Sequence, residues 1–339
     1  GLTISSLERI DLSRVEPRAL DQTMIAEWEA YIEELLNSNN IPGASVAVVQ
    51  DGEVVYTAGF GLREQGGDIP ITPDTHMMIG STGKSLTTTA MAIMVDNGLF
   101  DWDTPVIELL PQFAVANPEV SQTITMRHLV CACTGVPRRD VEIIFNANEM
   151  TAEDVVESLQ TFEFFTDFGE AFQYSNQMVA TSGFAAAAAE VSEYGALLDG
   201  YSNILTERVL NPLQMNNTTI SFDRVLERDD YATPHGLTLG GEYQAIPVDY
   251  EAILQPFAPA GGHWSTAEDM ARYLVMQLQN GVGPDGNRIL SEENLLVTRE
   301  PQIAVSADVS YGLGWFIVEY KRLPLVEHGG NTLGFTSDF

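Results

Sequence analysis

Apolar and polar residues follow two different rhythms near the start of the chain. Between residues 21 and 39 the apolar residues recur at helical spacing, and Asp21 stands where it can cap the first turn. The next segment, Ala44–Gly61, holds two β-rich runs on either side of Asp51-Gly52, a dipeptide typical of tight hairpin turns. The pattern therefore predicts a helix over residues 21–39, followed by a β-hairpin.

Helical patterns dominate from about residue 81 to residue 260, and strand patterns return near the C-terminus. Residues 265–281 predict a further helix, opened by a capping box of Ser265 with Glu268 and closed by a glycine. Strand character follows in residues 311–320 and 323–330. Strands at both ends of the chain with helices between them predict an α+β fold. We expect an N-terminal extension (1–20), a sheet domain (21–80 and 261–339) and an inserted all-helical domain (81–260).

Acidic residues outnumber basic ones by 48 to 16, which gives a formal net charge of −32. A surface of that sign repels nucleic acid and anionic membranes, so we expect neither as a partner. No run approaches the roughly 20 apolar residues that a membrane-spanning helix needs. The N-terminal residues lack the basic start and apolar block of a signal peptide. A signal peptide could have been removed from a mature chain, and we favour an extracytoplasmic location, periplasmic or secreted, over a cytoplasmic one.

The two cysteines, Cys131 and Cys133, are one residue apart. A disulfide across that spacing is strained, and the four ligands of a structural zinc site are absent, so we expect two buried thiols. The histidines at positions 76, 128, 235 and 263 show no metal-ligand spacing, and we interpret them as structural. The sequence implies no metal and no organic cofactor.

Only two lysines occur in the chain, and one of them, Lys84, stands in an apolar segment three residues after Ser81. The run that follows is helical, so Ser81 lies at or near a helix N-terminus and Lys84 lies on the same face one turn later. A lysine kept neutral by burial can take the proton of a serine hydroxyl and make it a nucleophile. The alternative is that Ser81 is an ordinary helix cap, because a Ser-x-x-Lys pattern also arises by chance.

The sequence around these residues, IGSTGKSLTTTAMAIMVDNGLFDWDTPVIELLP, resembles the first motif of the serine β-lactamase and penicillin-binding-protein superfamily. The branch it resembles contains class C β-lactamases, D-Ala-D-Ala carboxypeptidases, D-aminopeptidases and related carboxylesterases. The likeness continues through TMRHLVCACTGVPR, NPLQMNNTT, APAGGHWSTAEDMARYL and YGLGW, so it covers roughly residues 25–339. It implies an antiparallel sheet flanked by helices and built from both ends of the chain.

The family's second motif, Tyr-x-Asn, occurs twice, at residues 174–176 and 201–203. The context FGEAFQYSNQMVATSGF matches the family's turn and helix, so we assign the motif to Tyr174 and Asn176. We interpret Tyr201 and Asn203 as helix surface or packing. The third motif is found as His328-Gly329-Gly330, a variant of the family's Lys-Thr-Gly or His-x-Gly.

The resemblance implies that these motifs meet in one cleft, where Ser81 attacks an ester or amide carbonyl to form an acyl-enzyme. Either Tyr174, as a phenolate stabilised by Lys84, or Lys84 itself would take the proton, and the sequence leaves both assignments open. The backbone N–H groups of Ser81 and Asn331 would form the oxyanion hole, and Asn176 would orient Lys84.

The third motif bears on the substrate, which we expect to be a small ester, amide or peptide. Gly329 lacks the hydroxyl with which family members are thought to hold a substrate carboxylate. This departure favours a β-lactamase-like carboxylesterase with neutral substrates. A peptidase directed at D-amino acids, using His328, and a weak β-lactamase remain alternatives. A non-catalytic binding or assembly module on the same fold is the alternative of another class, although the nucleophile and its lysine are both present.

The sequence ends nine residues after Gly330, at Phe339. In the family that this chain resembles, at least one strand and usually a closing helix follow the third motif. Without them the strand ending at His328 would expose unpaired backbone groups. We therefore expect that these 339 residues are not the whole functional chain.

Overall fold

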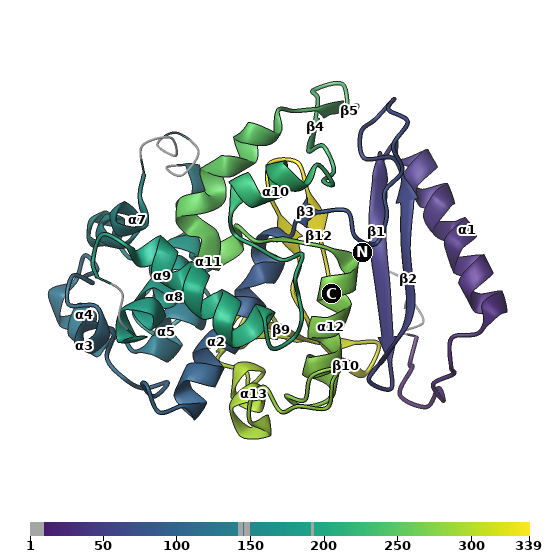
Figure 1. Cartoon of the computed structure of the whole chain (residues 1–339). Helices are drawn as coiled ribbons and strands as arrows, with labels where there is room; N and C mark the ends of the chain where they lie inside the picture. The colour runs from purple at the N-terminus through teal and green to yellow at the C-terminus, as the bar shows by residue number, and fades with distance from the viewer. Residues whose placement is uncertain (1–9, 142–144, 146–149, 191–192) are drawn as a thin grey trace, which may run out of the picture.

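Helix α1 (Gln22–Ser38) lies at one side of the molecule and covers the N-terminal hairpin (Figure 1). In this computed structural model, which describes residues 10–141, 145, 150–190 and 193–339, Asp21 caps α1 by accepting hydrogen bonds from two backbone N–H groups of the first turn. The predicted helix is therefore confirmed, together with its capping residue.

The hairpin consists of β1 (Gly43–Gln50) and β2 (Glu53–Gly61), which pair antiparallel. Asp51 and Gly52 connect them with φ angles of 54° and 78°. Two successive positive φ angles match the twist of the flanking strands, and the Asp-Gly dipeptide adopts them readily. The hairpin is confirmed at the predicted turn.

The other strands come mainly from the C-terminal part of the chain. Four of them form an antiparallel sheet in the order β10-β9-β8-β7, and its members are β7 (Ile303–Ala304), β8 (Val309–Tyr311), β9 (Phe316–Tyr320) and β10 (Leu323–Glu327). Short pairs add β3 (Met77–Met78) with β6 (Trp264–Ser265), and β11 (Gly330–Asn331) with β12 (Thr336–Ser337). Because β3 and β6 come from distant parts of the sequence, their pairing joins the two ends of the chain, as the α+β prediction requires.

Two apolar helices form the centre of the molecule: α2 (Lys84–Asp96) and α8 (Asn176–Glu190). Every residue of α2 from Lys84 to Met94 is buried, which is the pattern of a helix surrounded by protein on all sides. The surrounding helices and helical turns are α3 (Val106–Leu109), α4 (Pro118–Thr123), α5 (Met126–Val130), α7 (Ala152–Ser158), η2 (Leu159–Thr161), α9 (Leu197–Leu205), η3 (Thr206–Leu210), α10 (Phe222–Arg228), η4 (Val248–Phe257), α11 (Ala258–Gly261), α12 (Ala267–Leu278) and α13 (Glu292–Thr298).

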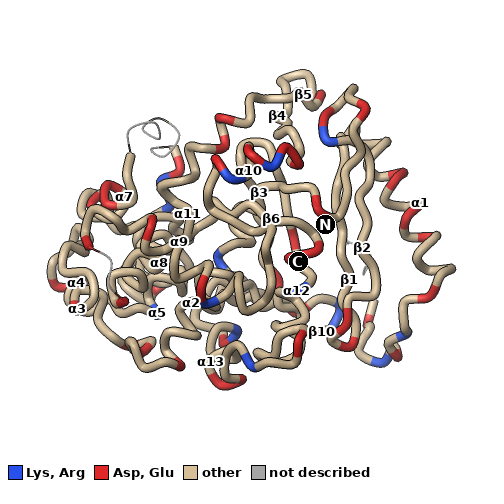
Figure 2. Tube along the Cα trace, in the orientation of Figure 1, with Lys and Arg blue, Asp and Glu red and all other residues tan. Residues whose placement is uncertain are grey.

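The segment 81–260 also holds a short hairpin of β4 (His235–Leu237) and β5 (Tyr243–Ala245), which an all-helical domain does not include. The boundaries of the predicted domains otherwise stay a prediction. Acidic residues recur along all parts of the described trace, with few basic ones between them (Figure 2). Within the described residues, no helix combines the length and apolar character needed to cross a bilayer.

The capping prediction for α12 was wrong by one residue. Thr266, and not Ser265, caps the helix by accepting from the backbone N–H of Asp269. Ser265 instead belongs to β6 and pairs with Met77. The Ser265 hydroxyl bonds Thr218 Oγ1 at 2.8 Å and so is not directed at the first turn of α12.

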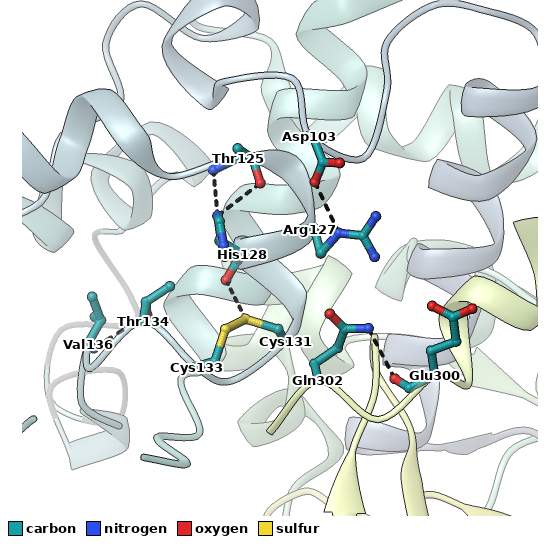
Figure 3. The surroundings of a disulfide bond; sticks show 10 residues. All are labelled: Asp103, Thr125, Arg127, His128, Cys131, Cys133, Thr134, Val136, Glu300 and Gln302. Carbon is teal, nitrogen blue, oxygen red and sulfur yellow. Dashed lines mark hydrogen bonds and ion pairs between the residues drawn. A yellow bond between two sulfur atoms is a disulfide. The ribbon is translucent and has the colours of Figure 1, made fainter. Parts of the chain in front are cut away.

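The prediction of two free thiols was also wrong, because Cys131 and Cys133 form a disulfide (Figure 3). Their Cα atoms are 5.2 Å apart, within the ordinary range for a disulfide. Ala132 between them has φ 53°, in the left-handed region, and this turn of the backbone brings the two side chains together. The Ala132 carbonyl accepts from Gln173 N–H at 2.7 Å, so the disulfide loop supports the backbone just before Tyr174.

Candidate active site

Ser81 lies in the helical turn η1 (Gly80–Gly83), which directly precedes α2. Gly80 adopts φ 51°, and a Cβ atom at this position would lie 2.7 Å from the backbone nitrogen of Asn331. Only glycine allows this approach, because any side chain would push the two segments apart. The glycine thus brings the backbone N–H of Asn331 close to Ser81.

Lys84 is completely buried, and its side-chain nitrogen, Nζ, lies within hydrogen-bond distance of three oxygen atoms. Nζ lies 3.0 Å from Ser81 Oγ and 2.8 Å from Asn176 Oδ1, and it also donates to the carbonyl of Ala260. Burial lowers the pKa of Lys84 well below its usual value. A neutral amine has two N–H bonds and one lone pair. Nζ is placed to donate to all three oxygens. Once the amine has lost a proton, Asn176 and Ala260 can accept from its two N–H bonds, and its lone pair is left for the Ser81 hydroxyl.

The amide of Asn176 links Lys84 to a carboxylate. Its Nδ2 donates to Asp140 Oδ1 at 2.9 Å, and Asp140 forms an ion pair with Arg138. The charge of Asp140 raises the pKa of Lys84, while that of Arg138 lowers it, and both effects are smaller than that of burial. Sequence reasoning missed Asp140 and Arg138, although both follow closely on the segment CACTGVP that resembles the family's turn.

Tyr174 lies beside the nucleophile and the lysine. Lys84 Nζ is 4.9 Å from the centre of its ring, and the guanidinium of Arg138 is 5.4 Å from it. Burial raises the pKa of Tyr174, and a hydrogen bond with Ser81 and the charge of Arg138 only partly oppose this. Burial thus favours the protonated phenol over the phenolate, which is one of the two alternatives considered from the sequence.

His328 packs beside the ring of Tyr174, at 6.2 Å between ring centres, and is almost completely buried. Its exposed fraction is 2%, Nδ1 donates to the carbonyl of Gly329 at 2.7 Å, and Nε2 accepts from the hydroxyl of Tyr311 at 3.1 Å. Burial, helped by the charge of Lys84, lowers the pKa of His328 to about 3. The imidazole is therefore neutral and has both nitrogens occupied, which leaves it no means of holding a substrate carboxylate.

The other third-motif residues serve different purposes. Gly330 is buried, and a Cβ atom there would lie 2.0 Å from the carbonyl oxygen of Ile79. Gly329 is exposed and Asn331 reaches the nucleophile, so of these residues the structure brings only Asn331 to Ser81. The second copy of the Tyr-x-Asn motif, residues 201–203, lies in helix α9.

A small cavity of about 40 Å³ opens beside the nucleophile. The residues that line it are Gly80, Ser81, Asn176, Leu254, Phe257, Ala260, Gly261 and Asn331. Leu254 and Phe257 come from η4 and give the cavity an apolar wall that sequence reasoning did not identify. In the described residues, no group of three or more His, Cys, Asp or Glu side chains is placed to hold a metal ion.

Comparison with known proteins places the chain in a family. Residues 28–338 match the family described as Beta-lactamase. Penicillin-binding protein 4 of Amycolatopsis lactamdurans is 27% identical over 317 residues, which are 91% of this chain and 80% of that protein. An unguisins hydrolase of Aspergillus campestris is 27% identical over 92% of this chain, and protein flp of Staphylococcus aureus is 26% identical over 91%. The chain spans only 58% and 59% of the lengths of these two relatives.

A solved structure shares the fold. The octameric penicillin-binding protein homologue from Pyrococcus abyssi superposes with a TM-score of 0.78, covering 93% of this chain and 70% of that one at 24% identity. Together, the match over nearly the whole chain and the shared architecture show that this chain belongs to the Beta-lactamase family and is related to the penicillin-binding proteins.

Proposed function

We propose that the chain is a serine hydrolase that cleaves short, neutral carboxylic esters through an acyl-enzyme on Ser81. One observation carries the proposal: Lys84 is buried, and Asn176 and Ala260 each accept a hydrogen bond from its amine nitrogen. The third contact of Nζ, at 3.0 Å, is the hydroxyl of Ser81. This is the arrangement that an amine needs to remove a proton from a serine.

The reaction then proceeds in two balanced steps. Lys84 takes the proton of Ser81 as Oγ attacks the ester carbonyl, and the backbone N–H groups of Ser81 and Asn331 stabilise the oxyanion. When the ester C–O bond breaks, the proton passes from Lys84 to the leaving alcohol. Water, deprotonated by Lys84, then attacks the acyl-enzyme. The bond between the acyl carbon and Ser81 Oγ breaks, Lys84 returns the proton to Oγ, and the carboxylic acid is released. Tyr174, which keeps its proton, supports Ser81 through their hydrogen bond.

The substrate class follows from the size and polarity of the site. The cavity of about 40 Å³ leaves room for a small group next to the Ser81 hydroxyl, and Leu254 and Phe257 make its wall apolar. The neutral, buried imidazole of His328 offers no charge to a substrate carboxylate. Both features support short, neutral acyl groups.

Hydrolysis of p-nitrophenyl acetate tests this proposal directly. We expect measurable turnover by the wild-type chain, and less than about a tenth of it in Ser81→Ala, with an unchanged circular dichroism spectrum, because only the nucleophile is removed. Ser85→Ala is the matched control: Ser85 is a buried serine one turn along, and its hydroxyl donates to the Thr82 carbonyl at 2.9 Å. Turnover by Ser81→Ala above a tenth of wild type would refute the assignment of the nucleophile.

A second candidate, a peptidase directed at D-amino acids or a weak β-lactamase, is favoured by one observation. The guanidinium of Arg138 lies beside the ring of Tyr174 and provides a positive charge near the nucleophile. Its ion pair with Asp140 offsets much of this charge. Hydrolysis of a D-Ala-D-Ala peptide or of nitrocefin with a kcat/KM at or above that for p-nitrophenyl acetate would favour this candidate over the esterase.

A further inference from the structure

A second cluster of buried polar side chains lies behind Lys84 and has no part in the chemistry above. Thr87, Tyr201 and His263 are all completely buried. The Tyr201 hydroxyl lies 2.7 Å from Thr87 Oγ1 and 2.7 Å from His263 Nε2. Thr87 Oγ1 also donates to the carbonyl of Pro259 at 2.7 Å. Burying three polar groups in an apolar core is costly unless each finds partners, so the connections between them matter.

The direction of each hydrogen bond in this cluster is fixed. The single hydroxyl proton of Thr87 is used on Pro259, so Thr87 must accept from the hydroxyl of Tyr201. The oxygen of Tyr201 must then accept from His263, which requires the proton of the imidazole to be on Nε2. Nδ1 of His263 is consequently unprotonated, and it has no hydrogen-bond partner in the structure.

The position of the His263 imidazole also explains why residue 83, in the first motif, is a glycine. A Cβ atom added to Gly83 would lie 2.1 Å from His263 Nδ1, so the ring packs directly against the backbone between Ser81 and Lys84. The cluster therefore contacts the turn of the nucleophile on one side. On its other side it holds Pro259, the residue before the carbonyl to which Lys84 donates.

We propose that Thr87, Tyr201 and His263 are positioning residues that hold the Pro259–Ala260 backbone where its carbonyl receives Lys84. Thr87 fixes one carbonyl of this segment and Lys84 binds the next one. A shift of that backbone by about 1 Å would turn the lone pair of Lys84 away from Ser81, and shifts of this size cost enzymes up to about a hundredfold in rate. The inference rests on the proposed role of Lys84 as the base.

Other groups around Lys84 contribute to its ionisation and must be kept constant in a test. The titratable and charged groups facing Lys84 from the elements packed against it are Arg138, Asp140, Tyr174, His263 and His328. Substitution of Thr87 leaves all of them in place. It removes the hydrogen bond to the Pro259 carbonyl and the acceptor of the Tyr201 hydroxyl, and it alters none of these five side chains itself.

The chain provides a matched control on the same helix. Thr89 Oγ1 lies 3.0 Å from the hydroxyl of Tyr273, so α2 carries a second buried Thr–Tyr hydrogen bond, which makes no contact with the Ser81 turn. Thr87→Val and Thr89→Val each replace a hydroxyl by a methyl group of the same shape and remove one hydrogen-bond partner of a tyrosine hydroxyl. Tyr201 keeps its bond with His263, and Tyr273 keeps its bond with Gln277. Both should lower the melting temperature by similar amounts.

Only Thr87→Val should change catalysis. We expect its kcat for p-nitrophenyl acetate to fall about tenfold or more with KM little changed, whereas Thr87→Ser, which keeps the hydroxyl, stays within about threefold of wild type. The acid limb of its pH–rate profile should also move to lower pH, because an ammonium that loses a carbonyl acceptor loses its proton more easily. Thr89→Val should keep the wild-type kcat and profile.

The same comparison can be made from the tyrosine side, with Tyr201→Phe against Tyr273→Phe, if Thr87→Val does not fold. Equal effects on kcat within either pair, or an unchanged acid limb in the Thr87 or Tyr201 variant, would overturn the inference. That result is distinguishable from failure of the proposed function, which would appear as residual turnover in Ser81→Ala.

Discussion

The side-chain amide of Asn176 bridges Lys84 and Asp140: its oxygen accepts from Lys84 Nζ at 2.8 Å and its nitrogen donates to Asp140 Oδ1 at 2.9 Å. If the amide were flipped, its NH2 group would face the Lys84 amine and its oxygen would face the Asp140 carboxylate, so both hydrogen bonds would be lost. It therefore fixes Lys84 at one end and is itself fixed by a carboxylate at the other. Asp140 is also the largest influence that raises the pKa of Lys84 against its burial.

This relationship predicts opposite pH shifts for two neighbouring substitutions. Asp140→Asn removes a charge that raises the pKa of Lys84, so the acid limb of kcat/KM should move to lower pH, by about half a unit or more. Arg138→Gln removes a charge that lowers this pKa, so the limb should move to higher pH. The sign follows because the active form is the neutral amine, which is lost as the pH falls through the pKa of Lys84. Profiles that move in the same direction would contradict the assignment of Lys84 as the base.

The two copies of the Tyr-x-Asn motif should differ in their effect on activity. Tyr174→Phe removes the hydroxyl that bonds Ser81, and we expect it to lower kcat about a hundredfold. Tyr201→Phe acts indirectly, through Thr87 and His263, and should cost about tenfold. Steady-state kinetics with p-nitrophenyl acetate measure both losses. If the two variants lose comparable activity, Tyr174 has been placed wrongly.

The length of the acyl chain should be limited by Leu254. We expect kcat/KM to fall from p-nitrophenyl acetate to the butyrate and the hexanoate. Leu254→Ala shortens a side chain of the apolar wall and so enlarges the cavity, and it should improve kcat/KM for the hexanoate relative to the acetate by about tenfold. Ile253→Ala is the control, since Ile253 is also half-buried but does not line this cavity. An equal change in both variants, or a wild-type preference for nitrocefin, would contradict the substrate class.

Two buried histidines should make the fold sensitive to acid. Burial lowers the pKa of both His263 and His328 to about 3, from about 6.5 in an unfolded chain. Between these values the unfolded state binds more protons than the folded state, so stability present above pH ~6.5 is lost as the pH falls towards ~3. Each histidine contributes a slope of up to about 1.4 kcal/mol per pH unit.

Urea unfolding at several pH values between 4 and 7 measures this slope. We expect His263→Leu to be less stable at pH 7 but to show a shallower loss of stability towards acid than the wild type. A parallel pH dependence in the two proteins would mean that His263 does not titrate on unfolding.

The sequence predicted the parts of the site that local spacing determines. Ser81 and Lys84 are three residues apart at a helix start, and this spacing alone brings Nζ to Oγ. The Asp51-Gly52 turn and the Asp21 cap were predictable for the same reason, because a short stretch of chain determines each.

Features that depend on distant segments were not predictable. His328 is buried because Tyr311 and Tyr174, from other parts of the chain, pack against it. The Cys131–Cys133 disulfide depends on a left-handed backbone at Ala132, a conformation that alanine seldom adopts and that no pattern of residues indicated.

Tyr201 is another residue whose contacts depend on distant segments of the chain. The sequence predicted helix surface or packing for this motif copy, and the Tyr201 side chain is completely buried while Asn203 is exposed. That its hydroxyl connects Thr87 to His263 required the structure, because α2, α9 and the segment before β6 meet only in the folded chain.

The most direct test of the account is the site at which a fluorophosphonate labels the protein. The probe phosphonylates an activated serine hydroxyl and displaces fluoride, so the adduct is stable enough to be located by digestion and mass spectrometry. We predict one adduct per chain, on Ser81, that is absent in Ser81→Ala and forms more slowly below the pH at which Lys84 takes up a proton. No adduct on the folded protein, or an adduct on another residue such as Ser85, would contradict the claim that Lys84 activates Ser81.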